Sequence, residues 1–319
     1  MGFGLGIGAG CLRGRMNDWG ERSAGLELPA GVVRAAVERA LAEDLPWGDV
    51  TSELLVPDAL AAAAVMVARA SGVVAGLPLA RAAFLAVSDL LSVEMQARDG
   101  ERVEAGRELM RVHGRARAIL AAERVALNFV QRLSGTATLT ARFVAAVAGT
   151  GARIVDTRKT TPGLRVLEKY AVRCGGGQNH RFHLGDAVLV KDNHREALGA
   201  AGLTLAEAVR AARRRLPHTV ALEIEVDTPV QLEEALAAEP DAILLDNMSP
   251  AELAAAVARI RALRPGTKVE ASGGVNLETV RAMAETGVDL ISVGALTHSA
   301  PALDVSLEFG IGRGEGSTK

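Results

Sequence analysis

Short apolar runs alternate with helical segments through the second half of this chain of 319 residues. Runs of β-branched and other apolar residues that stop at glycine, proline or polar residues are typical of buried strands. The predicted strands are 152–156, 186–190, 219–226, 241–245, 267–271 and 288–293, and the predicted helices are 162–174, 204–215, 229–238, 250–263 and 276–286. Strands that alternate with helices at this spacing predict a parallel sheet, open or closed.

Each of these strands ends in polar residues or glycine, which gathers chemically useful side chains at one edge of the sheet. A doubly wound sheet would concentrate its chemistry at one switch point. In an α/β barrel, by contrast, the carboxyl ends of many strands contribute to the site. The pattern therefore favours a TIM-like α/β barrel. The strand-end groups are Arg158–Lys159, Lys191, Glu225–Asp227, Asp246–Asn247, Ser272–Gly273–Gly274 and Gly294.

The first third of the chain has a different rhythm and predicts an α+β unit of about 90 residues. Its expected elements are a helix at 29–42, strands within 64–76, a helix at 77–90 and, within 91–113, a hairpin that turns at Asp99–Gly100. A long helical region follows at 116–148, and we expect Ser134–Gly135 to break it in two. Residues 300–311 alternate again and are expected to return to the first unit as one more strand.

Composition excludes several classes of partner. The net charge is −2 and aromatic residues make up 3%, so neither a basic field nor a stacking surface for nucleic acid is expected. No run reaches the ~18 apolar residues of a membrane span. The two cysteines, Cys11 and Cys174, are too few for a disulfide framework and fit a reducing cytoplasm. Residues 1–25 lack the features of a signal peptide or lipidation site, and we expect a flexible leader there.

The block from 154 to 194 carries more cations than anions and predicts an anion-binding site. Arg158 and Lys159 follow a predicted buried strand, where adjacent cations cost desolvation energy unless they meet an anion. Thr157 adds a hydroxyl donor, and arginine suits bidentate recognition of carboxylate or phosphate. A surface Arg–Lys pair is the simpler interpretation, but the strand-end position favours a site.

Two further cationic groups in this block allow more than one interpretation. His180–Arg181 follows Gly175–Gly177, and these glycines would let the backbone approach a ligand, although a flexible loop with a solvent-facing arginine is equally compatible. Histidines nearby do not have a zinc-site spacing. Lys191 could be an anion clamp, a Schiff-base nucleophile or one half of an ion pair within the barrel. The surrounding cations favour the clamp.

The later strands supply carboxylates and glycine loops. Glu223 and Glu225 lie on one face of their strand by alternation, and Asp246 ends the next strand. These carboxylates could balance the nearby cations, hold Mg²⁺ on a phosphate substrate or stabilise a cationic transition state. Loops after the late strands of a barrel often bind phosphate through backbone N–H groups. The two loops in this position are Ser272–Gly273–Gly274 and Val293–Gly294–Ala295.

Taken together, these motifs resemble the quinolinate phosphoribosyltransferase family, also called the carboxylating nicotinate-nucleotide pyrophosphorylases. The resemblance runs in order over about 27–311. The motifs that carry it are EDLPWGDVT (43–51), ERVALNFVQRLSGTAT (123–138), the block from Asp156 to His194, EIEVDT (223–228), ILLDN (243–247), EASGGV (270–275) and ISVGALTHS (291–299).

The resemblance implies an open α/β barrel with an N-terminal α/β sandwich domain, in a homodimer or dimer-based oligomer. The implied domains are a leader at 1–25, a sandwich at 26–130 plus 297–311, a catalytic barrel at 131–296 and a tail at 312–319. The implied reaction joins quinolinate to phosphoribosyl pyrophosphate and releases pyrophosphate and CO₂. It gives nicotinate mononucleotide for NAD synthesis, with Mg²⁺ accompanying the pyrophosphate and no organic cofactor.

The resemblance also assigns residues. It implies that Arg124, otherwise an ordinary solvated helix arginine, reaches quinolinate across the dimer. Glu225 and Asp246 would face the ribose and metal, with Lys159 as a third catalytic group. The dicarboxylate pocket would be lined by Thr157, Arg158, Lys159, His180, Arg181 and Lys191, and the 5′-phosphate cradle by Ser272, Gly273, Gly274, Val293, Gly294 and Ala295.

Three other functions stay open at this point. A relative with the same barrel could use another acceptor, such as nicotinate or the substrate of the molybdenum-associated paralogue, although nicotinate has one carboxylate fewer and would need fewer cations. Lys191 could instead serve a Schiff-base aldolase. A phosphate-binding barrel without turnover is the third alternative.

Overall fold

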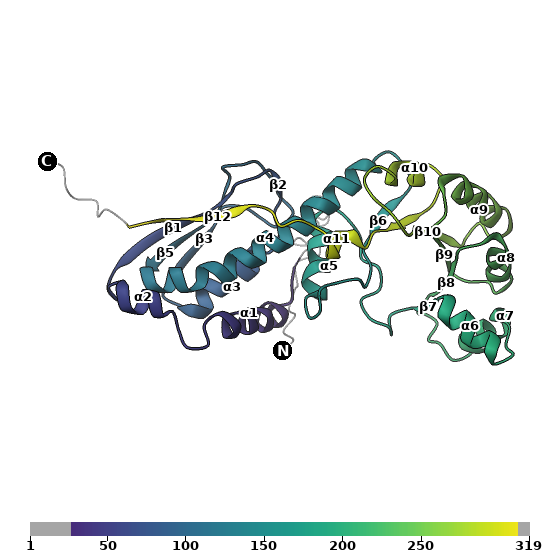
Figure 1. Cartoon of the computed structure of the whole chain (residues 1–319), viewed down its shortest axis with the longest axis horizontal. Coiled ribbons are helices and arrows are strands. Elements are labelled where there is room, and N and C mark those ends of the chain that lie inside the picture. Colours follow the sequence, from purple (N-terminus) through teal and green to yellow (C-terminus); the bar gives the residue numbers. More distant parts are fainter. Residues whose placement is uncertain (1–26, 312–319) are drawn as a thin grey trace, which may run out of the picture.

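The computed structural model describes residues 27–311, which form two lobes joined by one long helix (Figure 1). The leader predicted at 1–25, Cys11 and the tail predicted at 312–319 lie outside the described residues. No helix within 27–311 has both the length and the apolar character needed to cross a membrane.

The N-terminal lobe is a four-stranded antiparallel sheet with helices packed on it. The sheet order is β12–β1–β5–β3, so the last strand of the chain pairs with the first, as predicted for 300–311. A two-stranded ribbon, β2–β4, lies beside it. The elements are α1 (Ala30–Asp44), α2 (Val50–Leu55), β1 (Ala61–Ala68), β2 (Gly72–Val73), α3 (Leu77–Val87), β3 (Ser92–Met95), β4 (Arg102–Val103), β5 (Glu108–Arg115) and β12 (Val305–Gly310).

The hairpin predicted at Asp99–Gly100 is only partly correct. A turn does form there, since the N–H of Glu101 bonds the carbonyl of Arg98, but the strands on either side do not pair with each other. β3 pairs with β5, and β4 pairs with β2. Asp99 instead accepts the backbone N–H groups of Gly76 (2.8 Å) and Leu77 (3.1 Å) at the start of α3. The aspartate therefore caps a helix.

Helix α4 (Ala116–Ala146) corrects the prediction of a break at Ser134–Gly135. The helix runs unbroken for 31 residues from the N-terminal lobe to the barrel (Figure 1). The Ser134 hydroxyl bonds both the N–H (2.9 Å) and the carbonyl (3.1 Å) of Ala75. A Cβ on Gly135 would lie 2.1 Å from the carbonyl oxygen of Pro301. Ser134 and Gly135 thus let the segments around Ala75 and Pro301 pack closely against a continuous helix.

The second lobe is the predicted barrel. Its six strands are parallel in the order β6–β11–β10–β9–β8–β7, and β6 and β7 do not pair within the described residues, so the barrel is open. All six predicted strands are present: β6 (Arg153–Val155), β7 (Val188–Val190), β8 (Leu222–Val226), β9 (Ala242–Asp246), β10 (Lys268–Ser272) and β11 (Leu290–Ser292).

The helices around the barrel include all five predicted ones and two that sequence patterns missed, α6 and α11. Two of them begin with a capping box, in which Thr204 and Glu207, or Ser249 and Glu252, each bond the other's backbone N–H. The helices are α5 (Arg165–Cys174), α6 (Asp192–Ala200), α7 (Leu205–Arg213), α8 (Pro229–Ala237), α9 (Pro250–Leu263), α10 (Val280–Ala284) and α11 (Ala295–His298).

Strand alternation divides the barrel residues into two sets. Ile224, Ile243 and Val269 point outward into a buried apolar cluster beneath the helices. Their neighbours point to the barrel interior, which is polar at its carboxyl edge. Cross-strand register brings Glu270 level with Leu244, and Ser272 level with Asp246. The fold thus delivers acidic and hydroxyl groups to one concave surface.

Candidate active site

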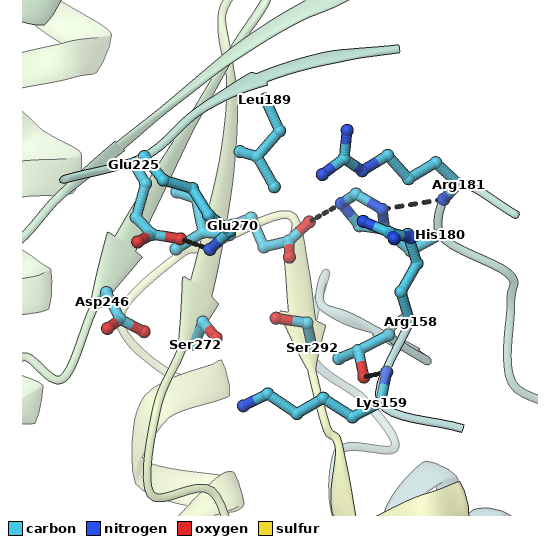
Figure 2. Close-up of a pocket in the computed structure, with 13 residues that line it drawn as sticks. Arg158, Lys159, His180, Arg181, Leu189, Glu225, Asp246, Glu270, Ser272 and Ser292 are labelled. Atoms are coloured by element: carbon cyan, nitrogen blue, oxygen red, sulfur yellow. Dashed lines mark hydrogen bonds and ion pairs between the residues drawn. The ribbon is translucent and has the colours of Figure 1, made fainter. Parts of the chain in front are cut away.

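A pocket of about 360 Å³ lies at the carboxyl edge of the barrel strands. Figure 2 shows Arg158 and Arg181 on one side of this pocket and the carboxylates of Glu225 and Asp246 on the other. Nine of the predicted site residues line it: Thr157, Arg158, Lys159, His180, Arg181, Lys191, Glu225, Asp246 and Ser272. Sequence reasoning missed the other four, which are Leu189, Leu244, Glu270 and Ser292.

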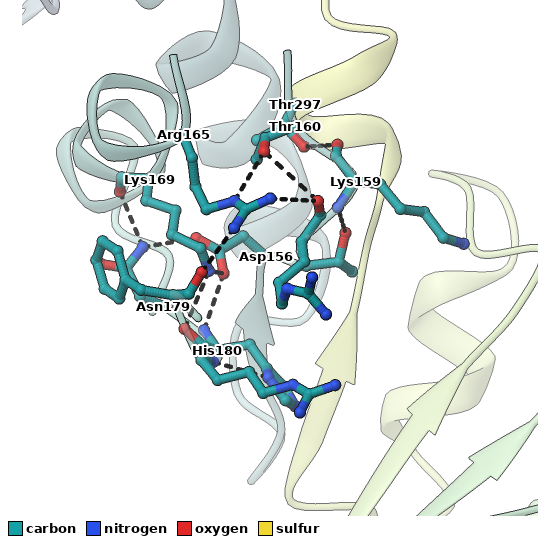
Figure 3. A network of polar contacts seen from close by, with 12 residues as sticks. Asp156, Lys159, Thr160, Arg165, Lys169, Asn179, His180 and Thr297 are labelled. Atoms are coloured by element: carbon teal, nitrogen blue, oxygen red, sulfur yellow. Dashed lines mark hydrogen bonds and ion pairs between the residues drawn. The ribbon is translucent and has the colours of Figure 1, made fainter. Parts of the chain in front are cut away.

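The cationic side is anchored by a buried ion pair between Asp156 and Lys169 (Figure 3). Asp156 also accepts hydrogen bonds from the side chain of Asn179 (2.6 Å) and the backbone N–H of His180 (2.8 Å). Lys169 donates to the His180 carbonyl (3.0 Å) and lies 5.0 Å from the Phe182 ring centre. Burial raises the pKa of Asp156 and lowers the pKa of Lys169. This cluster, defined as Asp156, Lys169 and Asn179, fixes the loop that carries His180 and Arg181.

The three-glycine run before that loop has a different role from the one expected. A Cβ on Gly175 would lie 2.3 Å from the carbonyl oxygen of Ala137 in α4. A Cβ on Gly177 would lie 2.8 Å from Thr140 and Val172. These glycines therefore let the end of α5 pack closely on α4, and they do not line the pocket.

The guanidinium groups of Arg158 and Arg181 are held in a partly buried setting. Burial, followed by the nearby Arg158, lowers the pKa of Arg181. Arg181 donates to the carbonyl of Ala187 (3.1 Å), whereas the buried Nε of Arg158 has no hydrogen-bond partner among the described residues. Lys159 is exposed, and its carbonyl accepts a bond from Thr297 (2.7 Å). An anion placed between these cations would supply the missing partner.

On the acidic side, Lys191 forms an ion pair within the barrel, which was one of its three predicted roles. Lys191 pairs with Glu225, so the lysine extends from the end of β7 to β8 across the pocket edge. Asp246 accepts a bond from the side chain of Asn247 (2.6 Å). Two carboxylates at the ends of neighbouring strands form an oxygen donor set of the kind that Mg²⁺ accepts.

The floor of the pocket contains a second buried cluster, His180, Glu223 and Glu270. His180 Nε2 lies 3.2 Å from Glu223 Oε2 and 3.6 Å from Glu270 Oε2. The ligand atoms of the three side chains all lie within 4.8 Å of one another, so they could share a proton or a cation. Burial lowers the pKa of His180, but the two glutamates more than offset this and raise it. Burial and Glu223 raise the pKa of Glu270 to about 7.

The remaining predicted site residues lie outside the pocket lining. Gly273 packs against Asn247, and Gly294 lies against the side chains of Lys159 and His298. Val293 is buried, and its N–H bonds the carbonyl of Val155 (2.9 Å), which leaves that N–H unavailable to a ligand. Arg124 is exposed on α4. The others are Gly274 and Ala295, the second of which begins α11.

Glu270 could have been found by the rule that revealed Glu223 and Glu225. Counting by two from Ser272 places Glu270 on the same face of its strand. A single carboxylate within an apolar strand gave no charge cluster to draw attention, so only the strand register brings it into the site.

Comparison with known proteins agrees with the geometry. Residues 136–308 match the quinolinate phosphoribosyl transferase C-terminal domain, and residues 49–134 match the N-terminal domain of the same family. The carboxylating nicotinate-nucleotide pyrophosphorylase of Mycobacterium leprae is 45% identical over 282 residues, covering 86% of this chain and 96% of the relative. A probable enzyme of the same name from Bacillus subtilis is 42% identical over 267 residues, covering 83% and 89%.

Solved structures lead to the same family. The nicotinate-nucleotide pyrophosphorylase of Francisella tularensis superposes with a TM-score of 0.81 at 36% identity and covers 89% of this chain and 98% of its own. NadC from Streptococcus pyogenes gives a TM-score of 0.82 at 37% identity, with coverage of 89% and 98%. The matched domains, the identity and the shared fold establish that this chain belongs to the quinolinate phosphoribosyltransferase family.

Proposed function

We propose that this chain transfers the phosphoribosyl group of phosphoribosyl pyrophosphate to quinolinate with loss of pyrophosphate and CO₂. The product is nicotinate mononucleotide, a precursor in NAD biosynthesis. One observation carries the proposal: a single pocket holds partly buried guanidinium groups on one wall and strand-end carboxylates on the other. The membership of the family supports it.

The cationic wall suits the acceptor. Quinolinate carries two carboxylates on adjacent ring carbons, and Arg158 and Arg181 lie on the same side of the pocket, which Lys159 also lines (Figure 2). Arginine can bind a carboxylate with two parallel hydrogen bonds, and an anion would satisfy the buried Nε of Arg158. Nicotinate has one carboxylate, so this concentration of cations favours quinolinate over a nicotinate-type acceptor.

The acidic wall suits the donor. Departure of pyrophosphate leaves positive charge on the ribose, and Glu225 and Asp246 could stabilise that charge as it develops. Ser272 and the loops at Gly273–Gly274 and Val293–Ala295 remain our proposed cradle for the 5′-phosphate. Because the Val293 N–H already bonds the carbonyl of Val155, Val293 would contribute to the cradle by packing and not by donating a hydrogen bond to the phosphate.

Magnesium has a suitable place beside the donor. Glu225 and Asp246 would hold it, since both carboxylates line the pocket and oxygen ligands are those that Mg²⁺ prefers. When bound, the ion would neutralise charge on the pyrophosphate. The ion pair between Lys191 and Glu225 would reorganise or share the carboxylate in that state.

The chemistry of Lys191 disfavours the aldolase alternative. A Schiff base requires a free amine. In this structure the Lys191 side chain is paired with the Glu225 carboxylate. We therefore assign Lys191 to charge balance and anion binding.

The main test is release of labelled CO₂ from carboxyl-labelled quinolinate, with and without phosphoribosyl pyrophosphate and Mg²⁺. We expect release that depends on both additions, accompanied by one pyrophosphate for each CO₂. If CO₂ release does not depend on the phosphoribosyl donor, the proposed reaction is wrong. Nicotinate offered as the acceptor in parallel distinguishes the closest alternative.

We further propose that the enzyme is a homodimer in which Arg124 serves the partner's pocket. Arg124 is exposed on α4 and does not line the pocket of its own chain within the described residues. Arg124→Ala and Lys159→Ala should each be inactive, but mixing them should restore about a quarter of the sites, because half of randomly exchanged dimers carry one intact site. The absence of rescue despite demonstrated subunit exchange would contradict a shared Arg124.

A further inference from the structure

Glu270 is a buried carboxyl group at the centre of the pocket floor. It lies on β10, its side chain is 1% exposed, and it lines the pocket. Figure 2 shows it between the acidic wall and His180. Neither of its carboxyl oxygens has a hydrogen-bond partner of ordinary geometry among residues 27–311. Buried polar atoms in folded proteins are almost always bonded, so this exception calls for a functional explanation.

The groups around Glu270 favour its protonated form. Glu223 on β8 and Asp156 after β6 both raise its pKa, as burial does most of all. His180 and the Ser292 hydroxyl on β11 act in the opposite direction. The balance brings the pKa to about 7, so near neutral pH a large fraction of the Glu270 side chain carries a proton.

His180 does not replace Glu270 as the acid. Its Nδ1 accepts the backbone N–H of Arg181 at 2.8 Å, so that nitrogen is unprotonated in this arrangement. The remaining ring proton then resides on Nε2, which faces Glu223 at 3.2 Å. A second ring proton would cost the bond to Arg181. Although the glutamates raise the pKa of His180, both of its ring nitrogens are engaged, Nδ1 with Arg181 and Nε2 with Glu223, so the carboxyl group without a hydrogen bond at the pocket floor is that of Glu270.

We infer that Glu270 is a catalytic residue that protonates the ring carbon from which CO₂ departs. This inference rests on the proposed function. In the step, the bond between that carbon and its carboxylate breaks, CO₂ leaves and the electron pair stays on the carbon beside the ribosylated nitrogen. A C–H bond then forms as the O–H bond of Glu270 breaks. Glu270 is left as a carboxylate and regains its proton from solvent.

The other pocket-lining groups are less suited to this step. The guanidinium groups of Arg158 and Arg181 do not release protons near neutral pH. Glu225 and Asp246 lie on the donor wall, away from the acceptor's cations (Figure 2). Lys159 extends below Ser292 and Ser272 in the same view, along the donor side. Glu270 alone among the thirteen lining residues combines a central position with burial and a carboxyl group that makes no hydrogen bond within the described residues.

The test compares Glu270→Gln with the matched exchange Glu223→Gln. Glutamine keeps the size of the side chain but cannot deliver a proton. For Glu270→Gln we expect quinolinate binding within about threefold of wild type and product formation in single turnovers reduced by at least about 100-fold, the usual scale of general acid catalysis. Pyrophosphate release, measured in the same turnovers, should fall much less.

The pH profile separates the two carboxylates. Wild-type turnover should fall as pH rises through about 7, because the acid form of Glu270 is lost. This alkaline limb should be absent in Glu270→Gln. In Glu223→Gln it should persist but move to lower pH, since removal of the Glu223 charge lowers the pKa of Glu270.

Several results would overturn the inference. The first is turnover of Glu270→Gln at the wild-type rate, and the second is a loss of activity explained entirely by weakened quinolinate binding. The third is a loss of pyrophosphate release as large as the loss of product formation. The fourth is a Glu223→Gln variant that loses as much activity as Glu270→Gln and also lacks the alkaline limb of the pH profile. Failure of the wild-type enzyme to release pyrophosphate from the donor in the presence of quinolinate would instead contradict the proposed function itself.

Discussion

The Asp156–Lys169–Asn179 cluster and the His180–Glu223–Glu270 cluster meet at one loop, but they treat buried charge in opposite ways. In the first, a carboxylate faces an ammonium group, and additional donors from Asn179 and His180 complete its bonding. In the second, two carboxyl groups share one histidine, and Glu270 is left without a hydrogen bond among the described residues.

The difference indicates different purposes. A buried charge costs free energy unless it is paired and hydrogen-bonded, and the first cluster meets both conditions. It can therefore hold the His180–Arg181 loop in place without taking part in chemistry. The second cluster retains a buried carboxyl group without a hydrogen bond at the pocket floor, and groups with perturbed pKa values gather at functional sites. Both clusters can be tested with substitutions that preserve side-chain shape.

The largest effect on stability should come from Lys169→Met. This change keeps most of the side-chain volume but leaves the Asp156 carboxylate buried without its counter-charge, which should cost about 3–5 kcal/mol in the free energy of unfolding. Urea denaturation with a constant m-value measures it.

The control for that prediction removes both charges. Lys169→Met combined with Asp156→Asn should recover part of the lost stability, because the unpaired carboxylate is gone. If the double variant is as unstable as the sum of the two single changes, the pair contributes through packing alone and the contrast between the clusters weakens.

Glu270→Gln should increase the free energy of unfolding, unlike Lys169→Met, and the size of this effect should depend on pH. The folded-state pKa of Glu270 is about 7, above the usual 4.5, so the folded protein holds a proton that the unfolded chain releases. The stability from this group is complete below about pH 4.5 and is lost as pH rises through about 7. Glutamine should therefore stabilise the protein at pH 8 by on the order of 3 kcal/mol and have little effect at pH 4.5.

Unfolding experiments at the two pH values check this directly. Glu252→Gln is a suitable control, because Glu252 is exposed and its pKa is lowered by Ser249 at the start of α9. Its removal should destabilise slightly at pH 8. A Glu270→Gln variant that is less stable than wild type at pH 8 would show that the folded protein stabilises the Glu270 carboxylate.

The sequence could predict features that depend on local patterns, but not those that depend on pairing between distant segments. Arg158, Lys159 and Lys191 were predictable because each follows a predicted buried strand, where an unpaired charge costs desolvation free energy. The open sheet was predictable because alternation of strands and helices is a local pattern. Pairings between distant segments were not, so the partner of Lys191, the floor position of Glu270 and the continuity of α4 through Ser134–Gly135 emerged only in three dimensions.

Asn179 provides the smallest change and the most specific test of how the clusters are connected. Its side chain bonds Asp156 (2.6 Å) and the carbonyl of Lys169 (2.9 Å), and the next residue, His180, reaches the second cluster. Asn179→Ala should therefore cost about 1–2 kcal/mol of stability, since Asp156 keeps its other donors. The same change should loosen His180.

The activity of Asn179→Ala decides whether the first cluster positions the second. A loosened His180 would leave Glu223 less well oriented, and the alkaline limb of the pH profile should shift while quinolinate binding weakens only modestly. An unchanged limb together with the expected loss of stability would mean that the satisfied cluster supports the fold but not the chemistry. The two buried clusters would then be neighbours in space without being coupled, because a positioning role requires the acid to respond when its support is removed.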